Sequence, residues 1–130
     1  MPITPAADLV AAAKAQVRRV TVDEARDGQA AGKMLLVDVR DIRELEKEGR
    51  IPGAVHAPRG MLEFWVDPAS PYHRPVFATD ATLVLVCAMS WRSALAAKAL
   101  QDMGVENVAD LDGGFDAWRA AGAPVERREA

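Results

Sequence analysis

The chain has 130 residues, of which 50% are apolar, and this suits one compact domain and leaves little room for two. Its 16 Lys and Arg residues against 19 Asp and Glu residues give a net charge of −3, which argues against a strongly basic nucleic-acid-binding protein and against an anionic membrane surface as partner. The single cysteine, Cys87, excludes an intrachain disulfide and a metal site built from thiolates alone. No apolar run approaches the roughly 20 residues of a membrane span, and no basic segment precedes the first apolar stretch, so we expect a cytoplasmic protein.

The first third of the chain predicts two helices and a buried strand. Apolar positions at helical spacing predict a helix over residues 5–17. Thr21 and Glu24 have the spacing of a capping box, which predicts a second helix over residues 22–31. The run over residues 34–39, which is apolar apart from Asp38, is typical of a parallel strand that is buried on both faces.

Shorter elements are expected in the middle of the chain. Residues 41–48 are polar and helix-prone, and a turn then leads into a short strand over residues 55–58. A further helix is expected over residues 60–67. Aromatic residues and prolines alternate in the segment 61–77, which either covers the sheet or forms a pocket wall or a partner surface.

The last third continues the alternation of strand and helix. Residues 82–86 predict a second strongly apolar strand, and Cys87 follows directly at its carboxyl end. A helix over residues 93–103, a strand over 107–111 and a helix over 115–121 complete the chain. This alternation predicts a parallel sheet with helices on both faces, whose ligands bind beyond the carboxyl ends of the strands.

The turn after Cys87 supports two interpretations. Four residues separate Cys87 from Arg92 and a helix follows, so backbone N–H groups and a helix N-terminus can converge on one concavity and hold an anion. Positive potential in that concavity favours the thiolate, which is the nucleophilic form of cysteine. In the other interpretation, Cys87 is a small buried core residue at the end of a strand.

Several short motifs occur in the order found in one known family. The chain reads DVR at 38–40, ELEKEGRIPGA at 44–54, CAMSWRS at 87–93, GVENV at 104–108, LDGGFDAW at 111–118 and GAPV at 122–125. Over residues 20–125 this series resembles a single rhodanese-homology domain. The resemblance implies a three-layer α/β/α rhodanese-like domain over residues 20–130, with a central, mainly parallel sheet of about five strands, preceded by an N-terminal helical extension over residues 1–19.

The resemblance also implies an activity. The family includes thiosulfate and other sulfurtransferases, in which a cysteine takes the outer, sulfane sulfur of a small anionic donor and passes it to a thiophilic acceptor such as cyanide, a thiol or a protein. We therefore expect a thiosulfate sulfurtransferase-like enzyme that works through a Cys87 persulfide and needs no metal and no organic cofactor. Its partners would be the sulfur donor and acceptor, with no nucleic acid and no membrane, and the sequence leaves the oligomeric state open.

The expected site is the loop that begins at Cys87. The resemblance makes Cys87 the nucleophile, and Arg92 the group that attracts the anionic donor and helps to keep the thiol ionised. The loop N–H groups expected to hold the donor and then the persulfide belong to Ala88, Met89, Ser90, Trp91, Arg92 and Ser93. Ser90 stands where the family usually has a loop glycine, and Trp91 is large for the rim of a pocket.

Three further residues lie near the same expected edge of the sheet. Asp38 either hydrogen-bonds the active loop or braces the turn between its strand and the next helix. Arg40 either joins the anion site or braces the same turn. Arg59 either faces the pocket as a donor-binding residue or is a solvated arginine.

Two alternative functions use the same loop. A non-enzymatic rhodanese-like module would hold an anion or a protein tail in the cradle without turnover. A phosphatase or arsenate reductase-like enzyme is disfavoured, because related phosphatases have one more residue between cysteine and arginine than the four found here.

Overall fold

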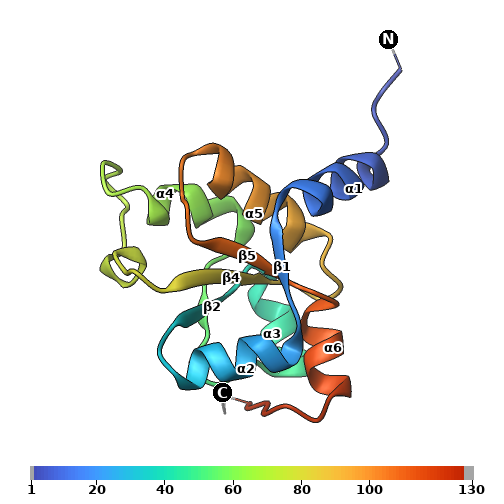
Figure 1. The fold of residues 1–130 in the computed structure, drawn as a ribbon, viewed down its shortest axis with the longest axis vertical. Helices are drawn as coiled ribbons and strands as arrows, with labels where there is room; N and C mark the ends of the chain where they lie inside the picture. Colours follow the sequence, from blue (N-terminus) through green and yellow to red (C-terminus); the bar gives the residue numbers. More distant parts are fainter. Residues whose placement is uncertain (1, 128–130) are drawn as a thin grey trace.

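The computed structural model describes residues 2–127, which form a five-stranded sheet (Figure 1). The strands are β1 (Arg18–Val20), β2 (Met34–Asp38), β3 (Val55–His56), β4 (Thr82–Val86) and β5 (Val108–Leu111). They lie in the order β1-β5-β4-β2-β3, and every neighbouring pair is parallel. Asp38 lies opposite Val86, so the chain leaves β2 and β4 at the same edge of the sheet.

Helices cover both faces of this sheet. In the described part of the chain the α-helices are α1 (Ala6–Gln16), α2 (Val22–Ala30), α3 (Ile42–Glu48), α4 (Leu62–Val66), α5 (Arg92–Asp102) and α6 (Gly114–Ala120). Helices α1, α4 and α5 lie on one face, and α2, α3 and α6 on the other (Figure 1). The predicted three-layer α/β/α architecture with a parallel sheet is confirmed. Across residues 2–127, every helix is too short or too polar to cross a membrane.

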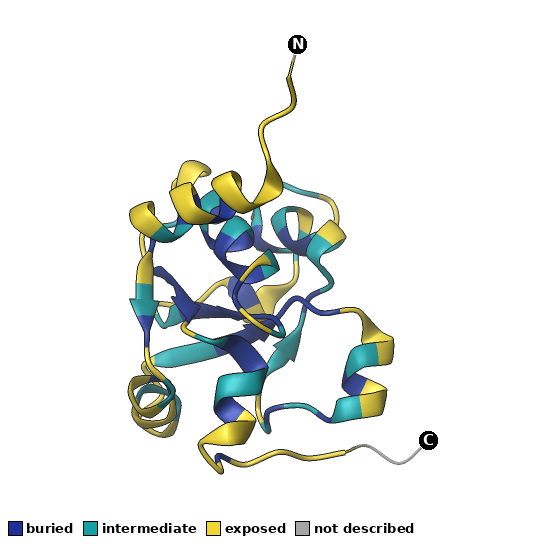
Figure 2. Ribbon diagram, turned by 90° about the vertical axis from the view of Figure 1, so that its right-hand side faces the viewer, coloured by how far each residue is buried: buried dark blue, intermediate teal, exposed yellow. Residues whose placement is uncertain are grey.

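The apolar run of β4 is buried on both faces. Leu83 and Leu85 pack in the cluster on the α5 side, whereas Val84 and Val86 pack in the cluster on the α6 side. None of these four side chains is more than 3% exposed, and Figure 2 shows the centre of the sheet buried between the helices. The prediction of a central strand here is confirmed, because successive side chains of a strand point to opposite faces.

Helices α2 and α3 each begin with a side-chain cap. At the start of α2, the Thr21 hydroxyl accepts from the Glu24 N–H and the Thr21 N–H donates to the Glu24 carboxylate, both at 3.1 Å, so the predicted capping box is confirmed. Asp41 and Glu44 form a second capping box at the start of α3, which the sequence analysis did not predict. This second box fixes the position of Glu44.

Three elements differ from the expected ones. The expected helix 60–67 is a 3₁₀ turn, Arg59–Met61, followed by the short α4. The expected strand 55–58 is reduced to the two residues of β3, and the chain turns into the 3₁₀ helix directly after Pro58. Strand β1 was not predicted; it is a three-residue edge strand that begins with two arginines and pairs with β5. It spans the expected division between residues 1–19 and 20–130, which remains a prediction.

The segment 61–77 covers the sheet and also presents aromatic side chains to solvent. Leu62, Val66 and Phe77 are buried in the cluster on the α5 side. Phe64 and Tyr72 are more than half exposed, and their rings meet edge to face with centroids 6.5 Å apart. A second short 3₁₀ helix, Pro75–Phe77, ends the segment.

Gly114 lets the start of α6 approach the residues that follow β4. The N–H groups of Phe115 and Asp116 donate to the carbonyls of Cys87 and Ala88 at 2.7 and 3.1 Å. Gly114 has φ +61°, and a Cβ atom there would lie 2.7 Å from the Ala88 oxygen and would also overlap the Cys87 oxygen. Only glycine combines this conformation with this approach.

We predict that Gly114→Ala lowers the free energy of unfolding by about 3 kcal/mol or more, because a left-handed alanine and an overpacked contact each cost roughly 1–3 kcal/mol. Gly122→Ala is the matched control, since Gly122 also has positive φ (+75°) but a methyl group there would meet no atom within 4 Å. It should cost only about 1 kcal/mol. Chemical denaturation of both variants measures the difference, and equal losses would contradict the steric argument.

Candidate active site

The loop from Cys87 to Ser93 joins β4 to α5 at the carboxyl edge of the sheet. Cys87 is only 1% exposed, and the Ser93 N–H donates to its Sγ at 3.3 Å. Within the described structure, the backbone N–H groups of residues 88–92 have no protein acceptor. A turn with unpaired N–H groups around one sulfur is chemically suited to hold negative charge.

Ser90 has the left-handed conformation that its place in the loop requires. Its φ is +69°, and it is the one non-glycine residue with positive φ among residues 2–127. The buried Ser90 hydroxyl donates to the Leu111 carbonyl at 2.6 Å, so it ties the loop to the end of β5. This hydrogen bond offsets the strain that a glycine would avoid. The flanking Met89 and Trp91 side chains are 63% and 50% exposed and lie on the solvent side of the loop.

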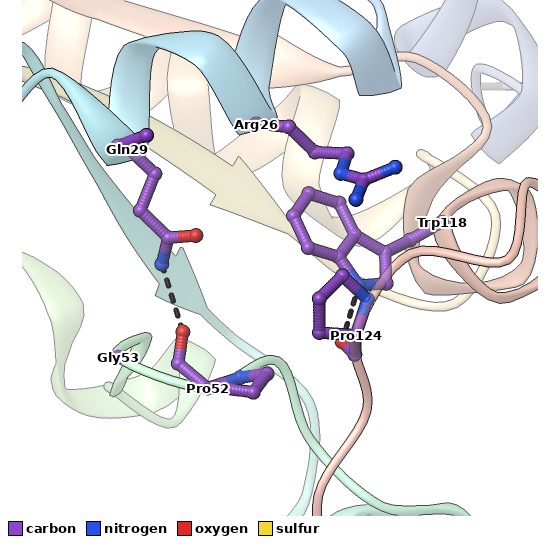
Figure 3. Close-up of a pocket in the computed structure, with 7 residues that line it drawn as sticks. Arg26, Gln29, Pro52, Gly53, Trp118 and Pro124 are labelled. Carbon is purple, nitrogen blue, oxygen red and sulfur yellow. Dashed lines mark hydrogen bonds between the residues drawn. The ribbon is translucent and has the colours of Figure 1, made fainter.

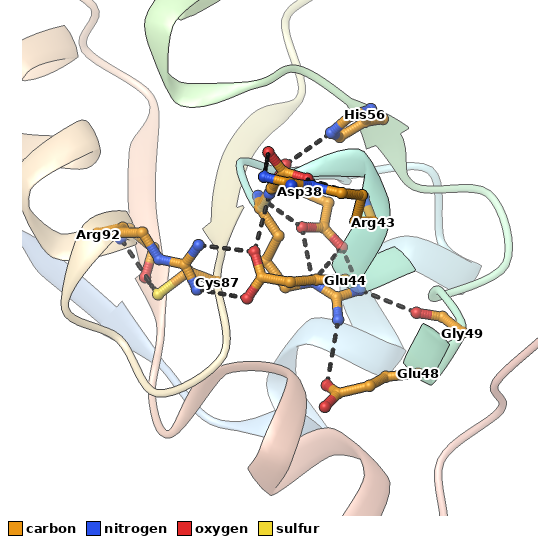
Figure 4. A network of polar contacts seen from close by, with 11 residues as sticks. Asp38, Arg43, Glu44, Glu48, Gly49, His56, Cys87 and Arg92 are labelled. Carbon is orange, nitrogen blue, oxygen red and sulfur yellow. Dashed lines mark hydrogen bonds and ion pairs between the residues drawn. The ribbon is translucent and has the colours of Figure 1, made fainter. Parts of the chain in front are cut away.

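Arg92 is held by a carboxylate from α3. Its two terminal nitrogens donate to the two oxygens of Glu44 at 2.8 and 2.9 Å, as Figure 4 shows. This bidentate contact raises the pKa of Arg92, with a smaller contribution from nearby Cys87, and lowers the pKa of Glu44. The pair is therefore charged at neutral pH, and an anion at the loop would meet an arginine whose charge is partly compensated.

Asp38 and Arg40 form a buried pair beside this site. Arg40 Nη2 donates to Asp38 at 2.8 Å and to the Gly49 carbonyl at 3.0 Å, and its guanidinium lies 4.1 Å from the Phe115 ring centroid. The Arg40 side chain has 0% exposure. The geometry thus supports the bracing interpretation for both residues. The expected place of Arg40 in the anion site stays a prediction, and its guanidinium has no exposed surface in this structure.

Arg59 also has a partner of its own. It begins the Arg59–Met61 turn, and its Nη1 lies 2.6 Å from the Glu63 carboxylate. Its side chain is about one-third exposed. In the described part of the chain it makes no polar contact with residues 87–93, so the structure does not bring it to the loop.

Two carboxylates near the loop were missed by the sequence analysis. One is Glu44, whose signal was its place three residues after Asp41 in a capping box. The other is Asp110, which accepts a hydrogen bond from the Ser93 hydroxyl at 2.5 Å. Asp110 is fully buried, and its signal was an acidic residue inside an otherwise apolar strand, which requires a partner.

A separate hollow of about 540 Å³ lies away from Cys87. Figure 3 shows it between α2, the turn before β3 and the end of α6. Gln29 donates to the Pro52 carbonyl at 2.8 Å on one side, and Trp118 donates to the Pro124 carbonyl at 2.7 Å on the other. Its lining is mostly apolar and contains no nucleophile, so the chemistry of the chain is concentrated at the Cys87 loop.

We predict that two substitutions at Ser90 differ in their effect on stability. Ser90→Ala keeps the left-handed strain and removes the donor to Leu111, so it should destabilise the fold by about 1–2 kcal/mol. Ser90→Gly loses the same hydrogen bond but relieves strain of about 1 kcal/mol, so its stability should stay near that of the natural chain. Thermal unfolding of the two variants side by side measures this. A glycine variant as unstable as the alanine variant would show that no strain is stored at Ser90.

Comparison with known proteins agrees with this architecture. A model of the Rhodanese-like domain family matches residues 21–121. A Rhodopseudomonas palustris protein of unknown function, described as a possible tyrosine phosphatase, is 45% identical with a TM-score of 0.88, over 97% of this chain and 99% of that one.

Two further solved structures are also similar. A polysulfide-sulfur transferase homodimer from Wolinella succinogenes is 29% identical with a TM-score of 0.70, over 94% of this chain and 87% of that one. A human single-domain sulfurtransferase is 27% identical with a TM-score of 0.67, over 78% of this chain and 95% of that one. Because the family model covers residues 21–121, this protein belongs to the rhodanese-like domain family, and the solved structures similar to it include sulfurtransferases.

Proposed function

We propose that this protein is a sulfurtransferase that carries sulfane sulfur as a Cys87 persulfide, from thiosulfate or a related small anionic donor to cyanide, a thiol or a protein acceptor. The observation that carries the proposal is the buried Cys87 sulfur, which receives the Ser93 N–H at the base of a loop whose other N–H groups are unpaired. The family and its sulfurtransferase members support it.

The first step loads the cysteine. The Cys87 thiolate attacks the outer sulfur of thiosulfate, a bond forms between Sγ and that sulfur, and the sulfur–sulfur bond of the donor breaks with its electron pair leaving on sulfite. Loop N–H groups of residues 88–93 would hold the donor oxygens and then the terminal sulfur of the persulfide. Arg92 would supply positive charge beside them.

The second step unloads it. A nucleophilic acceptor attacks the terminal sulfur of the persulfide, takes that atom, and leaves the electron pair of the broken sulfur–sulfur bond on Cys87. The cysteine itself carries the transferred group, so the two steps need no metal and no organic cofactor. The exposed Met89 and Trp91 would form the rim past which donor and acceptor enter in turn.

The loop length favours this chemistry over phosphoryl transfer. The description of the Rhodopseudomonas palustris relative raises a phosphatase as a second candidate. However, only four residues lie between Cys87 and Arg92, and the Arg92 guanidinium is already held in a bidentate contact with Glu44. A shorter loop has fewer N–H groups to surround a transferred phosphoryl group, whereas sulfur transfer places only a single sulfur atom on Cys87, so we assign sulfur transfer to this site.

We predict that the reduced protein gains the mass of one sulfur atom after brief exposure to thiosulfate. The gain should be absent in Cys87→Ala and should disappear when cyanide is added, because cyanide accepts the sulfur. Intact-mass spectrometry measures all three states, and a parallel assay with an aryl phosphate should give no hydrolysis.

The contrary results are equally specific. If neither thiosulfate nor polysulfide adds mass while Cys87 still reacts with an alkylating agent, the enzyme proposal fails and a non-enzymatic binding module takes its place. Hydrolysis of the phosphate ester that depends on Cys87 would instead support the phosphatase.

We further predict that Arg92→Gln lowers kcat/KM for thiosulfate by about 10- to 100-fold, since hydrogen bonds to charged groups contribute roughly 1.5–3 kcal/mol. Part of this loss comes from the Glu44 carboxylate, which the substitution leaves unpaired beside the loop. The double variant Glu44→Gln/Arg92→Gln removes that charge and should recover part of the activity. Steady-state kinetics of the two single variants and the double variant separate the contributions.

A double variant no more active than Arg92→Gln would contradict a repulsive effect of Glu44. Because the pKa of Glu44 is lowered, its carboxylate is ionised at neutral pH in the natural chain, and the kinetics of the variants are compared at that pH. The ion pair with Arg92 loosens only as the pH falls through that lowered pKa.

A further inference from the structure

Asp110 is a buried carboxylate that the proposed reaction does not use. It lies in β5 between Ala109 and Leu111, and its side chain has 0% exposure. A buried carboxylate costs free energy unless it is well paired, and an apolar residue would fill the same strand position at no such cost. Its best contact is with the Ser93 hydroxyl, 2.5 Å from Oδ1.

Ser93 connects this carboxylate to the nucleophile. The Cys87 sulfur lies 3.3 Å from the Ser93 Oγ, with the thiol as donor. A serine hydroxyl has one proton, and here that proton is directed to Asp110, so the Ser93 lone pairs are left to accept from Cys87. Thiol, hydroxyl and carboxylate thus form one continuous chain of hydrogen bonds.

The charges around this chain come from several elements. Arg19 on β1 has its Nε 3.4 Å from Asp110 Oδ2, and it also binds Asp112, which follows β5. Lys14 on α1 adds a weaker positive contribution. Arg92 at the start of α5 and Asp38 at the end of β2 lie on the Cys87 side.

These surroundings make Asp110 a better base than an ordinary aspartate. Burial raises the pKa of Asp110 above its usual range, and the hydrogen bond from Ser93 and the charge of Arg19 only partly oppose this effect. A carboxylate with a raised pKa accepts a proton more readily, and this one lies at the far end of a hydrogen-bond chain that starts at the thiol.

We propose that Asp110 accepts the proton of Cys87 through Ser93. The Sγ–H bond breaks and its proton moves to Ser93 Oγ, while the hydroxyl proton of Ser93 moves to Asp110 Oδ1. The electron pair of the broken bond stays on sulfur. The products are a Cys87 thiolate that accepts a hydrogen bond from Ser93, and a neutral Asp110 carboxylic acid. No other reactant takes part, and the total charge of the three groups is unchanged.

A proton relay and a carboxylate that acts only through its charge predict opposite changes in thiol reactivity when the Asp110 carboxylate is removed. A fixed negative charge near Cys87 disfavours the thiolate, so removing it would make the thiol more reactive. In the relay, the thiolate forms only because Asp110 takes the proton, so removing the carboxylate makes the thiol less reactive at mildly acidic pH. The inference rests on the proposed function for its use in catalysis, but the relay itself is measurable without any sulfur donor.

The test is the rate at which the full, reduced chain reacts with iodoacetamide between about pH 5 and pH 9, followed by intact mass. Cys87 is the single cysteine, so the modified site is unambiguous. We expect Asp110→Asn to react about tenfold more slowly than the natural chain near pH 5–6, because the base is lost. Above about pH 9 the difference should vanish or reverse, because hydroxide then removes the proton directly.

Matched variants separate the relay from structural damage. Ser93→Ala breaks the same chain and should lose the same reactivity at low pH, while Ser93→Thr keeps a hydroxyl and should regain most of it. Asp112 is the other carboxylate that binds Arg19, and its side chain is 58% exposed. Asp112→Asn should therefore keep the pH profile of the natural chain. Thermal unfolding verifies that each variant is folded.

Two results would overturn the relay. One is an Asp110→Asn variant that reacts faster than, or as fast as, the natural chain near pH 5–6. The other, decisive even if Asp110→Asn does not fold, is a Ser93→Ala variant that keeps the natural profile. If the relay holds but no donor adds sulfur to Cys87, the proposed function fails and the relay stands.

Discussion

The contact between the Cys87 loop and the start of α6 is the constraint on which the site depends. The Phe115 and Asp116 N–H groups donate hydrogen bonds to the carbonyls of Cys87 and Ala88, and Gly114 allows the two backbones to approach this closely. With these carbonyls held by α6, the loop N–H groups are left without protein acceptors. A buried sulfur at the end of a central strand therefore lies among donors whose positions are set by the backbone contact with α6 and by the Ser90 hydroxyl, and such preorganisation favours the binding of negative charge.

Charge around the sulfur is compensated in pairs that join different elements. The pairs are Asp38–Arg40, Glu44–Arg92 and Arg19–Asp110. The first is fully buried and links β2 to the Gly49 turn and the Phe115 ring, the second links α3 to the loop, and the third links β1 to β5. Each pair therefore reduces the net electrostatic field at the Cys87 loop. Glu44–Arg92 is the most exposed of the three, and it is the pair that an incoming anion can most readily disturb.

Local signals predicted most of the fold. The runs of β2 and β4 are apolar because both faces are covered, and the Thr21 capping box marks the start of α2 by hydrogen bonds within four residues. Strand β1 carried no such signal. It has three residues, two of them arginines, and it exists because β5 offers it an edge. The 3₁₀ turn before α4 likewise departs from the expected helix, since prolines and the packing of Leu62 decide the path there more than propensity does.

For the site, the sequence by itself determined that the single cysteine follows an apolar strand and that four residues separate it from Arg92, because these are properties of neighbouring residues. Only the tertiary structure decided what each charged side chain faces. It placed the Arg40 guanidinium against the Phe115 ring, brought Glu44 of α3 to Arg92, and brought Asp110 of β5 to Ser93. Glu44 and Arg92 are 48 residues apart and Ser93 and Asp110 are 17 apart, and no pattern of nearby residues encodes a contact that forms when separate strands and helices meet.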